Sequence, residues 1–183
     1  MKKTVIITGS SSGIGAAAAI EFAKSDYNVV INYNNSKEKA LKILEKVRAL
    51  GCLSIAVKAD VSKFEESKIL IEKCEEQFGG VDVLVNNAGI SEFKLFTDIT
   101  ESDWSKMIQT NLSSVFYCSK FAVKEMLKKH TGKIINISSM WGITGASCEV
   151  HYSAAKAGII GFTKALAKEL GPSGLKVNCI APG

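Results

Sequence analysis

Hydrophobic residues along this chain gather in short runs that alternate with longer segments of helical spacing. The runs are rich in β-branched residues and are bounded by glycine or polar residues, which is typical of strands that are buried on both faces of a sheet. The pattern predicts six strands, at residues 3–8, 28–33, 53–60, 81–89, 132–139 and 175–181.

The segments between these strands predict helices, at residues 14–25, 36–50, 62–78, 100–129 and 150–170. Ser62 is predicted to cap the third helix, and Thr100, with Asp103 three residues later, to cap the fourth. Gly51 and the pair Gly79-Gly80 are predicted to end the second and third helices.

Strict alternation of strands and helices predicts a doubly wound α/β domain of the dinucleotide-binding (Rossmann) type over residues 1–183. Right-handed crossovers give a parallel sheet with the strand order 3-2-1-4-5-6 and helices on both faces. Ligands in such a fold bind beyond the carboxyl ends of the strands, so the residues that follow each strand are the first candidates for chemistry.

Composition excludes several classes of protein. Of the 183 residues, 46% are hydrophobic and 22% are charged, which is the balance of an ordinary globular protein. No apolar run reaches the roughly 18 residues that span a bilayer, and the N-terminal "VIIT" is too short for a signal peptide, so we expect a cytoplasmic protein. The five cysteines are scattered without metal-ligand spacing, so neither a disulfide framework nor a metal site is expected.

The net charge of +5 comes almost wholly from lysine and is too dispersed for nucleic-acid binding. One exception is a stripe of helical spacing formed by Lys120, Lys124 and Lys128, with Lys129 adjacent. Such a stripe is usually a solvated helix face; the alternative is a docking surface for an acidic protein partner.

A glycine-rich turn, "TGSSSGIG", follows the first strand and contains Gly9, Gly13 and Gly15. Glycine lets the backbone approach a pyrophosphate, and the helix that begins near Ile14 offers free N–H groups to it. The spacing is GxxxGxG rather than GxGxxG, so a merely tight turn is the alternative.

Polar or small residues also follow four other strands: Asp60-Val61, "NNAG" at 86–89, Ser138-Ser139 and Pro182-Gly183. Asp60 could accept a hydrogen bond from an adenine amino group, although a cap-like turn explains it equally well. Because the carboxyl ends of parallel strands share one edge of the sheet, we expect one crevice for cofactor and substrate there.

Tyr152 and Lys156, in "HYSAAKAG", are four residues apart and share a helix face. A phenol with a pKa near 10 is a poor acid at neutral pH, but a nearby ammonium group favours phenolate. Ser139 could then bind a substrate carbonyl oxygen to which Tyr152 donates a proton. His151 is expected to be a bystander.

Taken together, "TGSSSGIG", "NNAG", Asn111, Ser139 and "YSAAK" resemble the classical short-chain dehydrogenase/reductase family. The resemblance implies an oxidoreductase with the catalytic residues Asn111, Ser139, Tyr152 and Lys156. Lys156 would also hold the nicotinamide ribose, and Asn111 would hold a water that relays protons. The implied cofactor contacts are Gly9, Ser11, Ser12, Gly13, Ile14, Gly15, Tyr33, Asn34, Asp60, Val61, Asn87, Ala88, Gly89, Tyr152, Lys156, Pro182 and Gly183.

The cofactor preference is predicted from residues 32–36, "NYNNS". Family members that prefer NAD usually carry an aspartate at the end of the second strand, and this segment has no acid, which favours NADP(H) over NAD(H). Ser12 stands where NADP-type members often carry a basic residue, so Asn34, Asn35, Ser36 and Lys37 would have to supply the phosphate contacts.

Two substrates are suggested by finer resemblance. "INYNNSKEKA", "VKADVS", "LVNNAGI" and "VNCIAPG" are similar to bacterial reductases of 3-oxoacyl groups on acyl carrier protein, in fatty acid biosynthesis. "SSMWGITGASCEVHYSAAKAG" is similar to reductases of the 5-aminopentanone modification on elongation factor P. Both carriers are acidic, which would give the lysine stripe a use.

Family members continue past the position of Gly183 into a substrate lid and a seventh strand, and they form homodimers or homotetramers. The resemblance therefore implies that the lid and last strand are missing here, and a non-catalytic nucleotide-binding module is the alternative of another class.

Overall fold

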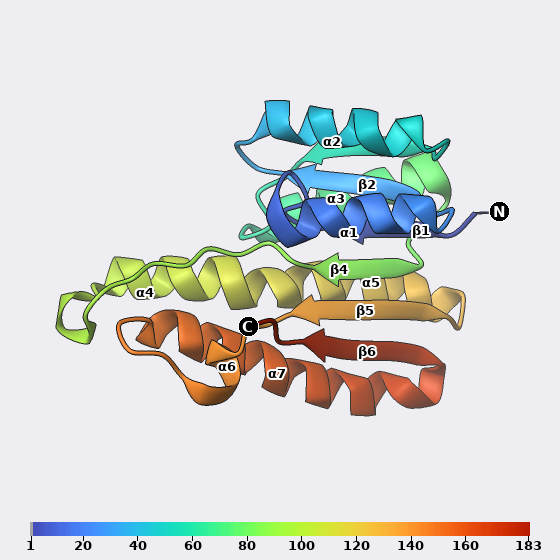
Figure 1. Cartoon of the computed structure of the whole chain (residues 1–183). Coiled ribbons are helices and arrows are strands. Elements are labelled where there is room, and N and C mark those ends of the chain that lie inside the picture. Colours follow the sequence, from blue (N-terminus) through green and yellow to red (C-terminus); the bar gives the residue numbers. More distant parts are fainter. Residues whose placement is uncertain (1) are drawn as a thin grey trace.

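One parallel sheet organises the computed structural model, which describes residues 2–183 (Figure 1). Its strands follow the order β3-β2-β1-β4-β5-β6, which confirms the predicted topology. Their bounds are β1 Thr4–Ile7, β2 Asn28–Tyr33, β3 Ser54–Lys58, β4 Val83–Asn86, β5 Gly132–Ile137 and β6 Leu175–Ile180.

Helices cover both faces of the sheet. The α-helices are α1 Gly13–Lys24, α2 Lys37–Ala49, α3 Phe64–Phe78, α4 Glu101–Ile108, α5 Ser114–Lys128, α6 Trp141–Thr144 and α7 Val150–Leu170. Shorter turns are η1 Phe96–Asp98, η2 Gln109–Ser113, which is π-helical, and η3 Gly171–Ser173.

The core has two layers because successive strand residues point to opposite faces. Ile6, Val30 and Leu84 pack against α3, α5 and α7 in one cluster. Ile7 and Ile31 pack against α1 and α2 in the other. Both faces of the central strands are therefore apolar, as their continuous hydrophobic sequence predicts.

The predicted helix over 100–129 is divided in the structure. Thr100 and Asp103 form the predicted capping box at the start of α4, in which the hydroxyl and carboxylate satisfy each other's backbone N–H groups. The π-helical turn η2 then separates α4 from α5. The sequence pattern does not show this turn, because an extra residue within one turn barely disturbs the hydrophobic spacing.

The predicted cap at Ser62 is wrong. Lys63 is the N-cap of α3, and the Ser62 hydroxyl instead donates to Oδ1 of Asp60 at 2.6 Å. Oδ1 of Asp60 also accepts from the Ser62 backbone N–H at 3.1 Å, so the aspartate closes the turn after β3. The predicted stop at Gly79 is confirmed, with φ of +76° at the C-cap of α3.

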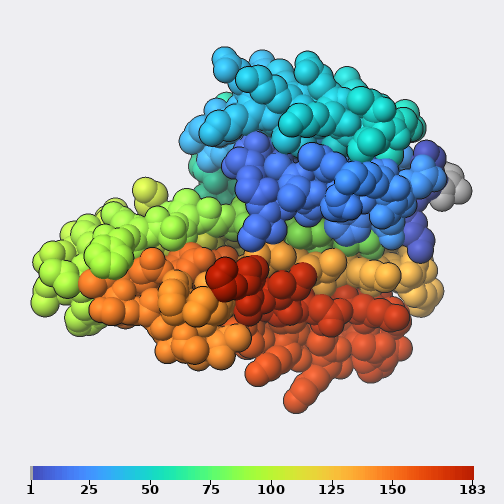
Figure 2. Space-filling view, in the orientation of Figure 1, coloured from blue at the N-terminus to red at the C-terminus, as the bar shows by residue number. Residues whose placement is uncertain are grey.

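The carboxyl ends of the strands face one end of the molecule, where distant parts of the sequence meet. In the space-filling view the blue segment after β1 lies next to the dark red C-terminal residues and the orange segment that follows β5 (Figure 2). Within residues 2–183, no helix is both long and apolar enough to cross a bilayer.

Candidate active site

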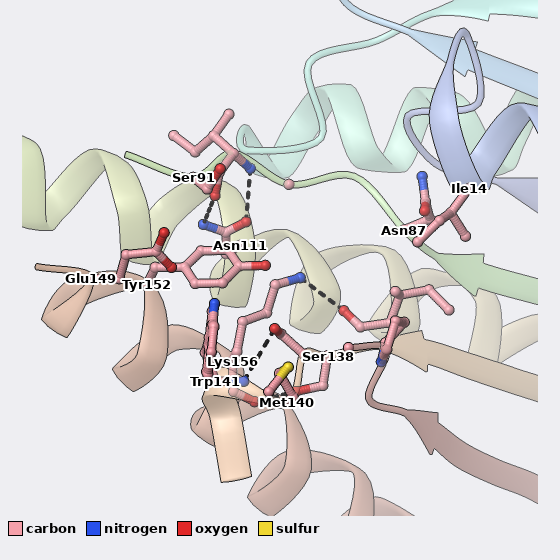
Figure 3. A pocket seen from close by; sticks show the side chains of 16 residues that line it. Ile14, Asn87, Ser91, Asn111, Ser138, Met140, Trp141, Glu149, Tyr152 and Lys156 are labelled. Carbon is pink, nitrogen blue, oxygen red and sulfur yellow. Dashed lines mark hydrogen bonds between the residues drawn. The ribbon is translucent and has the colours of Figure 1, made fainter. Parts of the chain in front are cut away.

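A pocket of about 420 Å³ opens at the carboxyl ends of β4, β5 and β6 (Figure 3). Asn111, Ser139, Tyr152 and Lys156 all line it, although they come from three separate segments of the chain. The predicted cofactor contacts Ile14, Asn87, Gly89, Pro182 and Gly183 line the same pocket. The structure therefore brings together the four residues that the sequence marks as catalytic.

Lys156 lies at the base of this pocket and is only 4% exposed. Its Nζ donates to the Ile137 carbonyl at the end of β5, at 2.9 Å. Nζ also lies 5.6 Å from the centre of the Tyr152 ring, as their spacing of four residues on α7 predicts. Burial lowers the pKa of Lys156 to about 8, so most of the amine is still protonated at neutral pH.

The two serines after β5 have different roles. The Ser138 hydroxyl is buried and donates to the Lys156 backbone carbonyl at 2.7 Å, which ties the end of β5 to α7. Ser139 Oγ accepts from the Trp141 backbone N–H at 3.2 Å. No acceptor for the Ser139 hydroxyl proton is found in the part of the chain that the structure describes, so this proton can be donated to a ligand.

Asn111 sits in the π-helical turn η2 and is fully buried. Its Oδ1 accepts from the Ile90 N–H and its Nδ2 donates to the Ile90 carbonyl, both at 2.9 Å. A Cβ on Gly89 would lie 2.5 Å from this Oδ1, so the close approach requires glycine. The Asn111 amide thus holds the segment after β4 against the helix; a role in a water relay stays a prediction.

A second hollow, of about 440 Å³, adjoins the first, and Asn87, Gly89 and Ile90 line both. Most of the predicted cofactor residues gather in it: Gly9, Ser11, Ser12, Asn34, Asp60, Val61, Asn87, Ala88 and Gly89. Asn35 and Ser36, two of the predicted phosphate contacts, line it as well. Its position beyond β1, β2 and β3 is where a parallel sheet of this kind binds a nucleotide.

The glycine-rich turn fits a dinucleotide. Gly9 and Gly13 have φ of +63° and +56°, which disfavour any residue with a side chain. Helix α1 begins after Ser12 without a side-chain cap, so its first N–H groups are available to an anion. A Cβ on Gly9 would come within 2.9 Å of the Ala88 Cα, so the turn packs directly on the segment after β4.

Asparagine side chains hold the strand ends around this hollow, one buried (Asn32) and one half-buried (Asn87). Asn32 Oδ1 accepts from the Gly9 N–H at 3.1 Å, and its Nδ2 donates to the Ala59 carbonyl at 2.9 Å. Asn87 Nδ2 donates to the Thr8 carbonyl at 2.9 Å. Asn32 was not predicted as a site residue. Its position at the end of the second strand is the only feature of the sequence that could have indicated this role.

Three of the predicted cofactor contacts, and Lys37 of the predicted phosphate contacts, do not line either hollow. Tyr33 is 8% exposed, and its ring packs in the core beside α2, because all of β2 is buried. Gly13 and Gly15 lie within the first turn of α1, and Gly15 is pressed against the backbone of Gly9 and Ser10. These two glycines shape the turn rather than the surface of the hollow.

Some residues of the pocket were missed by the sequence reasoning: Ser91, Met140, Trp141 and Glu149. Trp141 begins α6, which has four residues and is too short to show a helical period. His151 is fully buried and does not line the pocket; its Nε2 lies 4.0 Å from a carboxylate oxygen of Glu92.

The fold and its two adjoining hollows are those of a dinucleotide-binding α/β protein. A family model described as short chain dehydrogenase matches residues 3–183, and the chain belongs to that family, whose members are oxidoreductases that act on CH–OH or C=O groups.

Curated relatives are similar over nearly the whole chain. The 3-oxoacyl-[acyl-carrier-protein] reductase FabG of Staphylococcus aureus is 44% identical over 183 residues, which cover 100% of this chain and 74% of the relative. A 3-oxoacyl-[acyl-carrier-protein] reductase of Synechocystis is 44% identical over 181 residues, or 99% of this chain and 73% of the relative. The solved structure of a protein from Sinorhizobium meliloti 1021, assigned as a short-chain alcohol dehydrogenase, has a TM-score of 0.96 at 31% identity, covering 100% of this chain and 73% of that one.

Proposed function

We propose that this protein reduces a ketone to a secondary alcohol with NADPH, using Asn111, Ser139, Tyr152 and Lys156. The observation that carries the proposal is the convergence of Ser139, Tyr152 and Lys156 on one pocket that adjoins a glycine-lined hollow. A phenol, a cation and a hydroxyl donor around one cavity are what proton transfer to a carbonyl oxygen requires.

Each residue has a distinct role in the proposed reaction. The Ser139 hydroxyl donates to the substrate carbonyl oxygen and orients it. Tyr152 donates its proton to the same oxygen, and Lys156, 5.6 Å from the ring centre, stabilises the phenolate that remains. Asn111 keeps the segment after β4 in place through Ile90. The dinucleotide, when bound, supplies the hydride.

The cofactor would lie along both hollows. The N-terminus of α1 and the turn from Gly9 would bind the pyrophosphate, and Asp60 would face the adenine. Asn34, Asn35 and Ser36 would surround the adenosine ribose, where side-chain amides and a hydroxyl can donate to a 2′-phosphate. No carboxylate lies in residues 32–36 to repel that phosphate.

We therefore expect NADPH to bind at least about ten-fold more tightly than NADH. NADH lacks the 2′-phosphate, and a difference of this size corresponds to the loss of one or two charge-assisted hydrogen bonds. Asn34→Asp is expected to reverse the order, because its carboxylate would repel the 2′-phosphate. Fluorescence titration of both dinucleotides measures the constants. Tighter NADH binding by the unchanged protein would contradict the proposed preference.

Two substrates remain candidates. The 3-oxoacyl group on acyl carrier protein is supported by the names of the relatives from Staphylococcus aureus and Synechocystis. The 5-aminopentanone on elongation factor P is supported by the sequence around Trp141 and Glu149, both of which line the pocket. For either carrier, the four exposed lysines of α5 and its end are the proposed docking surface: Lys120, Lys124, Lys128 and Lys129.

That lysine surface is not purely basic. Lys128 pairs with Glu125 at 2.6 Å, and Lys120 and Lys124 share a hollow with Glu72 and Glu75 of α3. Neighbouring glutamates thus neutralise much of the positive charge of these lysines, so an acidic carrier would contact a surface with charges of both signs.

We also propose self-association as a homodimer or homotetramer. Trp104 on α4 is 42% exposed and Phe116 on α5 is 44% exposed, and such large apolar side chains on adjoining helices favour an interface.

The proposal is tested by NADPH oxidation with an acetoacetyl thioester as the ketone. Turnover that depends on both substrates is the expected result. Binding of NADPH with no turnover of this or any other ketone would instead favour a nucleotide-binding module without catalysis.

A further inference from the structure

The pocket carries opposite charges at two places. Of the side chains that line it, Lys156 is the only cation and Glu149 the only carboxylate. In Figure 3 Glu149 lies to the left of the Tyr152 ring and Trp141 lies below it, whereas Ile14 and Asn87 lie at the right. Because Asn87 also lines the proposed cofactor hollow, Glu149 lies at the substrate end.

Glu149 is half-buried and has no structural partner that would explain it. It is the N-cap residue of α7, but its side chain makes no capping hydrogen bond. Within residues 2–183 its carboxylate also forms no ion pair and accepts no other hydrogen bond. The positive end of the α7 dipole favours its negative charge, so a carboxylate is held at the pocket wall with both oxygens available.

The position of Glu149 relative to Tyr152 determines what it can contact. The two residues are three apart at the start of α7, so their side chains leave the helix next to each other. A ketone whose oxygen reaches the Tyr152 hydroxyl would extend its chain past Glu149. Trp141 borders the same space, and an indole face attracts cations as a carboxylate does.

We infer that Glu149 and Trp141 form a subsite for a positively charged group on the substrate, so that the preferred substrates are cationic ketones. This inference rests on the proposed ketone reduction and narrows its substrate class. A carboxylate that only repelled anions would give neutral and cationic ketones the same kcat/KM. A subsite with an aromatic wall would give the cationic ketone the higher value.

The test compares two ketones of the same shape, (4-oxopentyl)trimethylammonium and 6,6-dimethylheptan-2-one, in which a carbon replaces the charged nitrogen. With NADPH, kcat/KM is expected to be about ten-fold higher for the cation, because an ion pair and a cation–π contact combine in a partly buried site. The preference should be found in KM rather than kcat, since the contacts do not change during the reaction.

Glu149→Gln keeps the shape of the side chain and is expected to lower the ratio of the two kcat/KM values to near one. Glu92→Gln is the matched control, because Glu92 is 46% exposed, lies close to His151 on α7 and does not line the pocket. This control should keep the ten-fold preference.

The outcomes separate the two proposals. If neither these ketones nor the acetoacetyl thioester are reduced, the proposed function fails; if only the thioester is reduced, the subsite is contradicted while the reductase stands. If the neutral ketone is reduced as well as the cation, or if Glu149→Gln keeps the preference, the subsite is contradicted while the reductase stands.

Discussion

Tyr152→Phe is expected to lower kcat for ketone reduction by about a thousand-fold, the range that a positioned general acid contributes. The variant keeps the ring, which lies 5.6 Å from Lys156 Nζ, and removes only the hydroxyl that donates the proton. The dissociation constant of NADPH should change by no more than a few-fold, because most of the proposed cofactor contacts lie in the other hollow. NADPH oxidation and fluorescence titration measure the two quantities.

Tyr27→Phe serves as the control for this variant. Tyr27 packs edge-on against Phe22 before β2, at the end of the sheet opposite the pocket. Tyr27→Phe also removes a phenolic hydroxyl, but one that lies away from the site, so the kcat of this variant should equal that of the unchanged protein. Turnover by Tyr152→Phe above about a tenth of the normal rate would refute the acid role of Tyr152.

Much of this site could be predicted because its positions are set by local rules. Continuous β-branched runs predict a parallel sheet, and a parallel sheet brings the residues after Thr8, Asn86 and Ile137 to one edge. A spacing of four residues places Tyr152 and Lys156 together on α7. These inferences need no knowledge of how distant segments pack.

Other features depend on packing and could not be predicted. The spacing of four residues shows that Lys156 shares a face of α7 with Tyr152. It does not show how deeply Lys156 is buried against the end of β5, and this burial lowers its pKa to about 8. Asn111, in the π-helical turn, likewise makes a long-range contact that its own segment does not reveal, the paired hydrogen bonds to Ile90. Tyr33 does not line the hollow because its ring packs in the core, and a strand that is buried along its whole length does not show from sequence which residues reach the hollow.

Gly15→Ala is expected to destabilise the protein by about 3 kcal/mol, at the upper end of the cost of overpacking. The added Cβ would lie 2.8 Å from the Gly9 carbonyl oxygen and 2.9 Å from the Ser10 Cα, both backbone atoms that cannot rotate away. It would also lie 2.5 Å from Asn87 Nδ2, which holds the Thr8 carbonyl. Because this contact borders the cofactor hollow, NADPH should bind at least about ten-fold more weakly.

The matched control is Gly161→Ala on the exposed side of α7, where no atom lies within 4 Å of the added Cβ. There the alanine only restricts the unfolded chain, and it should stabilise the protein by about 0.5–1 kcal/mol. The same change from glycine to alanine is thus expected to have opposite signs at two helical positions, measured by urea unfolding. If Gly15→Ala also stabilised the protein, the helix propensity of alanine would outweigh the contact, and the turn from Gly9 would not need its close packing against α1.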